Sequence, residues 1–143
     1  MDAALIARYF GGKEGLYLAA LQRQERGVRL PADPARALEH MLGKADRRGS
    51  GPVGLAMVSP GLTDTMREQV REIVARHVVA PLAAELGARD VPDADLRAEL
   101  LVAIATGISL TRAGGTLPAL AAAPLEEILA VLAPLVDALQ APP

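Results

Sequence analysis

The sequence predicts an all-α protein, and its composition, its periodicity and the placement of glycine and proline each support this prediction. Apolar residues make up 51% of the chain and aromatic residues only 2%, so the core is aliphatic and rich in alanine, a composition that favours helix. Apolar residues recur at spacings of three and four through several segments, which is the period of a helix packed on one side. Glycines and prolines separate these segments, and no segment predicts a strand.

Seven helices are expected in chain order. The first ends at Gly11-Gly12, because glycine enters left-handed conformations without a Cβ penalty, and the second begins at Lys13. The expected ranges are 4–10, 13–28, 34–45, 52–58, 64–87, 94–113 and 124–139.

Capping signals mark the middle of the chain. Asp33 is predicted to cap the third helix, with Pro34 in its first position. The polar, glycine-rich stretch 44–51 is expected to form a loop. Thr63 should cap the long helix that follows, and Pro81 should kink that helix because proline has no amide hydrogen to donate.

The last two helices carry more apolar surface than a small monomer buries. Residues 94–113 are apolar on almost every side, whereas a surface helix needs only one apolar stripe. Such a surface indicates an interface, and the simplest arrangement is a two-fold homodimer in which each protomer gives the same helix pair to a four-helix bundle. The expected interface residues are Leu100, Ile104, Ile108, Ile128, Leu129, Leu132 and Val136.

Whole-chain properties narrow the class of protein. With 143 residues the chain is long enough to bury a core, and the absence of cysteine excludes disulfides and thiolate metal sites. No uncharged apolar run reaches the length of a membrane span, and the N-terminus lacks the pattern of a signal peptide. A cytoplasmic protein is therefore expected.

The charge is unevenly distributed along the chain. The net charge of −2 argues against non-specific nucleic-acid binding. Residues 1–29 nevertheless carry five basic and three acidic side chains, a charge of +2, which leaves −4 for the remainder. A basic end on an acidic body fits a DNA-proximal segment followed by a regulatory domain.

One motif resembles a known family. The run Tyr9-Phe10-Gly11-Gly12-Lys13-Glu14-Gly15-Leu16-Tyr17 resembles the end of the DNA-binding domain of TetR-type transcriptional regulators. In that family a recognition helix ends in an aromatic pair, and Lys-Glu opens the helix that joins the DNA-binding domain to the core. Two positions depart from the pattern, because Gly12 stands where a capping serine is usual and Ala7 where a phosphate-contacting tyrosine is frequent.

The resemblance implies a domain division and a set of DNA contacts. Residues 1–29 would be the end of a helix-turn-helix domain, and residues 30–143 a regulatory and dimerisation domain. Arg8, Tyr9 and Lys13 would contact the DNA backbone. Only three residues precede the recognition helix, whereas a helix-turn-helix needs another helix there, so we expect an N-terminally shortened form of such a regulator.

TetR-like cores hold a small-molecule cavity, and the resemblance implies one here. Its walls would be aliphatic, and a few hydroxyls and Arg112 would orient the ligand. Serine and threonine on a helix also bond back to the carbonyl four residues earlier, and a histidine on a helix face is usually structural, so these alternatives stay open. The candidate pocket residues are Leu38, Met41, Leu42, Leu55, Met57, Val58, Ser59, Val74, His77, Ile104, Thr106, Ser109 and Arg112.

No catalytic residue, metal site or cofactor is expected. The chain has only two histidines, His40 and His77, and contains neither a His-Glu-x-x-His motif nor a nucleophile elbow. The predicted function is a TetR-like regulator, a repressor in which an unknown effector controls operator binding by a homodimer. The alternative is a helical dimer that binds no DNA and acts as a small-molecule binding module or a heterodimer partner.

Overall fold

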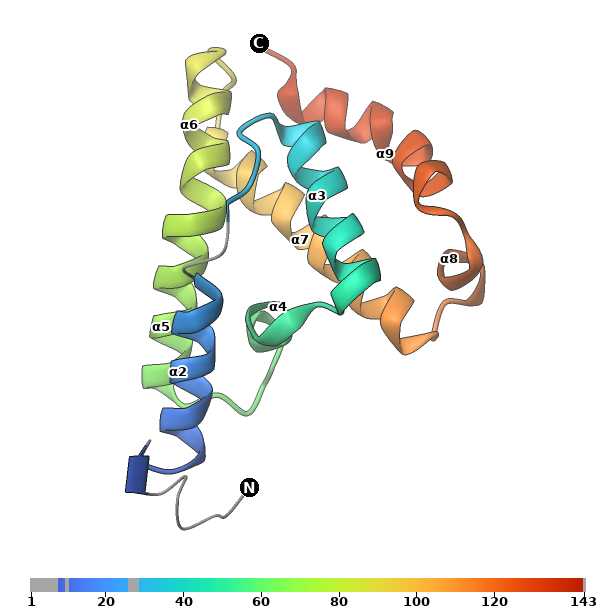
Figure 1. Cartoon of the computed structure of the whole chain (residues 1–143). Coiled ribbons are helices and arrows are strands. Elements are labelled where there is room, and N and C mark those ends of the chain that lie inside the picture. Colours follow the sequence, from blue (N-terminus) through green and yellow to red (C-terminus); the bar gives the residue numbers. More distant parts are fainter. Residues whose placement is uncertain (1–7, 10, 26–28, 143) are drawn as a thin grey trace.

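The computed structural model describes residues 8–9, 11–25 and 29–142, and these residues confirm the all-α prediction (Figure 1). No strand occurs among them. The elements are α2 (Lys13–Glu25), α3 (Pro34–Arg48), α4 (Gly51–Met57), α5 (Asp64–Val74), the π-helical segment η1 (Ala75–Val79), α6 (Ala80–Ala88), α7 (Ala94–Gly114), α8 (Pro118–Ala122) and α9 (Leu125–Gln140).

Seven helices result when α5, η1 and α6 are counted as the single continuous helix that they form within the described part of the chain. The predicted recognition helix over 4–10 lies outside the described residues, apart from Arg8 and Tyr9, which are helical. α8 was not predicted, because its five residues are too few to show a helical period. Pro118 begins it, as proline does at the first position of a helix.

Two hydrophobic clusters hold the helices together. The larger joins α3, α6, α7 and α9, and its most deeply buried side chains include Leu38, Leu82 and Leu101. The smaller joins α2, α4 and α5 through Leu21, Ala56, Val70 and Ile73. The continuous helix α5–η1–α6, coloured green to yellow in Figure 1, runs past both clusters and is the element that they share.

The irregularity predicted at Pro81 takes the form of a π turn. The Ala80 amide donates to the Ala75 carbonyl five residues earlier, in place of the usual four. Proline cannot donate this bond, and its ring crowds the carbonyl of the preceding turn, so a wider turn directly before it lets the helix continue.

The predicted caps of two helices are confirmed, and a third helix ends at a left-handed glycine. The carboxylate of Asp33 accepts the Arg36 amide at 3.0 Å, with Pro34 as the first residue of α3. The Thr63 hydroxyl accepts the Met66 amide at 3.3 Å at the start of α5. α7 ends with Gly115 in the left-handed conformation, at φ 64°.

The predicted loop over residues 44–51 is wrong. α3 continues to Arg48, and α4 begins at Gly51. Lysine, alanine and arginine are good helix formers, and basic side chains in the last turn stabilise a helix C-terminus, so polarity alone did not indicate a loop here. The connection is only Gly49, at φ 76°, and Ser50.

Asp33 also connects the N-terminal end of α3 to the C-terminal end of α6. Its second carboxylate oxygen accepts the Arg89 guanidinium at 3.2 Å, and Arg89 in turn donates to Glu85 and Gln140. The pKa of Asp33 lies below its ordinary value, chiefly because the Arg36 amide donates to the carboxylate and also because Arg89 stabilises its negative charge. Its contribution to stability is therefore present above the unfolded pKa and is lost as the pH falls.

We predict that Asp33→Ala lowers the free energy of unfolding by about 1 kcal/mol at pH 7, the usual cost of removing a helix N-cap. The difference should shrink below about pH 4, where the carboxyl of the wild type becomes protonated. Urea denaturation followed by circular dichroism at pH 7 and pH 3 measures both values. Asp137→Ala, on an exposed part of α9, is the control, and an equal loss in that variant would contradict the cap assignment.

Candidate functional site

A pocket of about 120 Å³ opens between α3, α4, η1 and α7. α3 contributes side chains spaced along one of its faces, and α7 contributes positions 102, 105, 106 and 109, which also share a face. Val78 of the π turn forms part of the wall. The complete lining is Leu30, His40, Met41, Lys44, Ala45, Gly49, Ser50, Val53, Gly54, Met57, Val78, Val102, Ala105, Thr106 and Ser109.

The wall of the pocket is mainly apolar, and its polar groups gather on α3, at the start of α4 and on α7. The Ser50 hydroxyl is buried and has no hydrogen-bond partner among the described residues. Ser109 is only 8% exposed, and the Thr106 hydroxyl lies 4.0 Å from the sulfur of Met57. A buried polar group without a partner is costly, so the Ser50 hydroxyl has hydrogen-bonding capacity left for a polar ligand.

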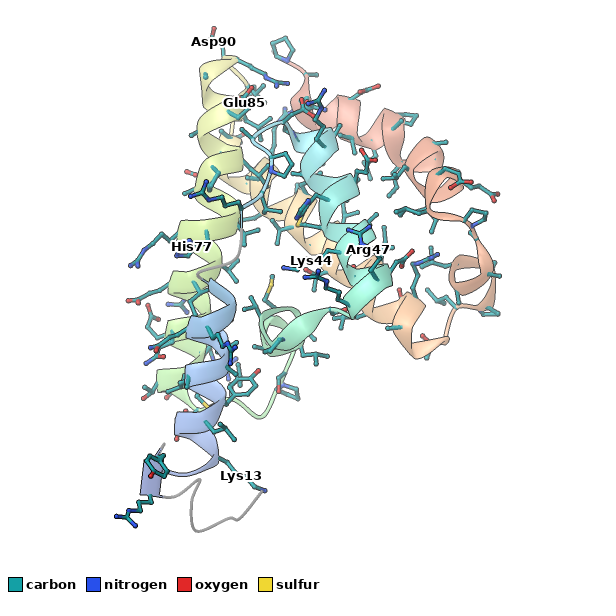
Figure 2. The ribbon with its side chains drawn as sticks, in the orientation of Figure 1. Lys13, Lys44, Arg47, His77, Glu85 and Asp90 are labelled. Atoms are coloured by element: carbon teal, nitrogen blue, oxygen red, sulfur yellow. The ribbon has the colours of Figure 1, made fainter. Side chains whose placement is uncertain are left out.

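Lys44 gives this pocket a positive charge. It is half-buried on the C-terminal half of α3, near α4 (Figure 2), and it forms no hydrogen bond or ion pair with any residue that the structure describes. Asp46, two residues further on, is bound to Arg112 at 2.9 Å. No aspartate or glutamate lines the pocket.

Four of the predicted pocket residues line this pocket, namely Met41, Met57, Thr106 and Ser109. Leu38 and Leu42 lie in the larger cluster, at 2% and 1% exposure, and Leu55 and Val58 lie on the exposed side of the α4 region. The others lie outside the lining: Ser59, His77 and Ile104 are half-buried, Val74 packs against the smaller cluster, and Arg112 anchors helices elsewhere.

Sequence reasoning missed several lining residues, above all Lys44, Ser50 and Val78. The first two fall in the stretch that was predicted to be a loop, and a loop has no regular period from which the direction of a side chain can be predicted. Extending the helical period of Met41 through Lys44 and Ala45 would have revealed that α3 presents both to the same neighbour.

Arg112 is a structural anchor in this fold. Its guanidinium donates to both carboxylate oxygens of Asp46, at 3.1 and 2.9 Å, and to the carbonyls of Leu120 and Ala123, at 2.6 and 2.9 Å. Its side chain is only 13% exposed. These bonds fasten α3 and the turn around α8 to the C-terminal end of α7.

The predicted DNA-contacting residues lie at the end of the chain where α2 begins. Tyr9 is 74% exposed, Arg8 is exposed, and Lys13 projects from the first turn of α2 (Figure 2). The neighbouring Glu14 accepts a hydrogen bond from the Thr63 hydroxyl, which also caps α5. The start of α2 is thus joined directly to the start of α5.

The predicted interface residues fall into two groups. Ile128 and Val136 are buried within the protomer, at 6% and 4% exposure. Leu100 is 44% exposed, whereas Ile104, Ile108, Leu129 and Leu132 are half-buried. Beyond these, Leu96 on α7 and Val131 and Leu135 on α9 are exposed by 56%, 75% and 46%, and the sequence analysis did not select them.

Comparison with protein families gives one match. Residues 34–139, which span α3 to α9 almost completely, match the C-terminal domain of tetracycline repressor-like proteins. The chain belongs to the TetR family. Searches of curated proteins and of solved structures gave no match. The described part of this TetR-like chain contains no helix that is both long and apolar enough to cross a membrane.

We predict that Arg112→Met destabilises the protein by about 2–3 kcal/mol, because it removes charge-assisted bonds from a mostly buried site and leaves Asp46 unpaired. Thermal or urea denaturation measures this loss. The control is Arg71→Met, which removes an exposed ion pair to Glu68 and should cost less than about 1 kcal/mol. Equal losses in the two variants would show that Arg112 is not an anchor.

Proposed function

We propose that the protein is a TetR-like transcriptional repressor, and not an enzyme, in which a small molecule bound between α3, α4, η1 and α7 controls operator binding by a homodimer. The observation that carries this proposal is the position of the pocket. It lies between the larger hydrophobic cluster and the smaller cluster that holds α2.

α4 offers a direct route from the pocket to α2. Val53 and Met57 of α4 line the pocket, while Ala56 of the same helix packs with Leu21 of α2. The Tyr17 hydroxyl of α2 also donates to the Pro52 carbonyl, at 3.4 Å. A ligand that displaces α4 therefore displaces α2. An effector needs two arrangements of the protein that it binds with different affinity, and the positions of α4 and α2 would distinguish them.

The proposed DNA-binding segment is residues 1–29, and the regulatory and dimerisation domain is residues 30–143. Arg8, Tyr9 and Lys13 would bind the DNA backbone, where basic and aromatic hydroxyl side chains position a protein without reading its sequence. A helix-turn-helix requires a helix ahead of the recognition helix, so operator binding is proposed for a protein that carries one.

The proposed dimer interface is the exposed apolar side of α7 and α9. Leu96, Leu100, Val131 and Leu135 are large apolar side chains with at least 44% exposure. An exposed surface of this kind is costly in water, and a second copy of the same helix pair would bury it. Leu129 and Leu132, half-buried on another side of α9, would lie at the margin of the contact.

We predict that Val131→Glu weakens dimerisation by about 100-fold or more, because it places an unpaired charge in the centre of an apolar interface. Light scattering or sedimentation should give a dimer mass for the wild type, twice 14.9 kDa, and a monomer mass for the variant at the same concentration. Leu117→Glu is the control, since Leu117 is 50% exposed at the start of α8 and away from the proposed interface. A monomeric wild type would refute the dimer.

The operator proposal is tested by gel-shift titration over a range of salt concentrations, using the region upstream of the gene and a protein with a complete helix-turn-helix. Lys13→Ala should weaken binding to all sequences alike and reduce the salt dependence by about one counterion. Arg48→Ala, at the exposed end of α3, should leave binding unchanged. Absence of salt-sensitive, sequence-selective binding would favour the alternative, a helical dimer that binds no DNA.

A further inference from the structure

The strongest unexplained feature of the pocket is its uncompensated positive charge. Lys44 is half-buried in a wall that contains no carboxylate. Asp46, two residues further on, accepts a bond from Arg112 at each of its carboxylate oxygens. Removing an ammonium group from water without a counter-charge is unfavourable. An anionic ligand would remove this penalty.

A purely structural role explains the other basic residues of α3 but not Lys44. Arg47 and Arg48 are exposed in the last turn of the helix, where they interact favourably with the helix dipole. Lys44 lies one turn earlier and partly out of the solvent, so it gains less from the dipole and loses more hydration. Its position in the pocket lining is the distinguishing observation.

A second, independent polar group lies at the same end of α3. The buried Ser50 hydroxyl has no partner among the described residues, although a hydroxyl can both donate and accept. Ser50 is the second residue after the end of α3, and it lines the same pocket as Lys44. An ammonium and a hydroxyl donor together suit the two oxygens of one carboxylate.

The size and the wall of the pocket limit the rest of the ligand. An apolar cavity of about 150 Å³ holds a benzene molecule, so a pocket of about 120 Å³ holds a ligand with about four to six carbons in all. The wall there is formed by flexible or aliphatic side chains such as Met41, Met57 and Val102, and the lining contains no phenylalanine, tyrosine or tryptophan to stack on a flat ligand. A single fixed cation suits a single negative charge.

We propose that the effector is a short-chain monocarboxylic acid, whose carboxylate binds the ammonium of Lys44 and the hydroxyl of Ser50 while its alkyl chain fills the space lined by Met41, Met57 and Val102. This inference rests on the proposed function, because it identifies the ligand class of the same pocket. The binding involves no covalent step, and the ligand enters as its anion.

Isothermal titration calorimetry on the whole chain tests the ligand class. The probes are butyrate, valerate, hexanoate and decanoate, each paired with the neutral amide of the same length. The acids should bind at least about tenfold more tightly than their amides, the gain expected of a charge-assisted hydrogen bond. Affinity should be highest at about four to six carbons. Equal affinities for acids and amides, a preference for decanoate, or no binding by any acid would each overturn the proposal.

Variants separate the role of Lys44 from a general effect of charge. Lys44→Met should reduce acid affinity about tenfold or more and leave amide affinity unchanged, and Lys44→Arg should restore most of the acid affinity. Ser50→Ala should cause a smaller loss, for acids and amides alike, because an amide group also hydrogen-bonds to a hydroxyl. The matched control is Arg48→Met, which removes one positive charge from an exposed position of the same helix. An equal effect of Arg48→Met and Lys44→Met would refute the contact.

Circular dichroism melting of each variant shows whether it is folded before its affinity is interpreted. A failure of the acid series would leave the proposed regulator function intact, because the dimer mass and the operator titration do not use these ligands. Conversely, a monomeric protein that binds short acids through Lys44 would support the ligand class and refute the repressor.

Discussion

The missing amide hydrogen of Pro81 is the constraint on which the arrangement of the pocket depends. It prevents a regular α-helical turn, and the chain responds with the π turn over Ala75–Val79. That wider turn lies at the junction of the two hydrophobic clusters and brings Val78 into the wall of the pocket. π turns are frequent at functional sites because they change the face that a helix presents, and here the change occurs where a ligand would lie.

The two clusters differ greatly in how much they bury. The smaller consists of Leu21, Ala56, Val70 and Ile73, whereas the larger draws fully buried leucines from α3, α6 and α7. Regions with few buried apolar contacts open at lower free energy than the main core. Among the described residues, the contact of α2 and α4 with α5 is therefore more easily displaced than the larger cluster, which suits a segment that is proposed to transmit a signal.

Local chemistry made much of the fold predictable. The caps at Asp33 and Thr63 were identified from the sequence because a cap depends on a residue and its immediate neighbours. The pocket lining depended on which helix faces which, and no local pattern contains that. The same limit applies to the proposed interface on α9: Ile128 and Val131 are both apolar, yet packing against α3 and α7 buries the first and leaves the second exposed. The interface residues chosen from the sequence include both orientations for this reason.

The distribution of polar anchors indicates which side of the pocket should move. Arg112 fastens α7 to α3 and to the turn around α8, and Arg97 fastens the start of α7 to the carbonyls at the end of α9. The α3–α7 wall is thus held by the ion pair between Asp46 and Arg112, whose side chain is only 13% exposed. Among the described residues, the α4 wall is held to α2 by the smaller cluster and by the hydrogen bond from the Tyr17 hydroxyl to the Pro52 carbonyl. On the proposed function, a ligand that needs more room would displace α4 and α2 before Lys44, so its carboxylate would stay bound to the α3–α7 wall while its apolar chain moves α4.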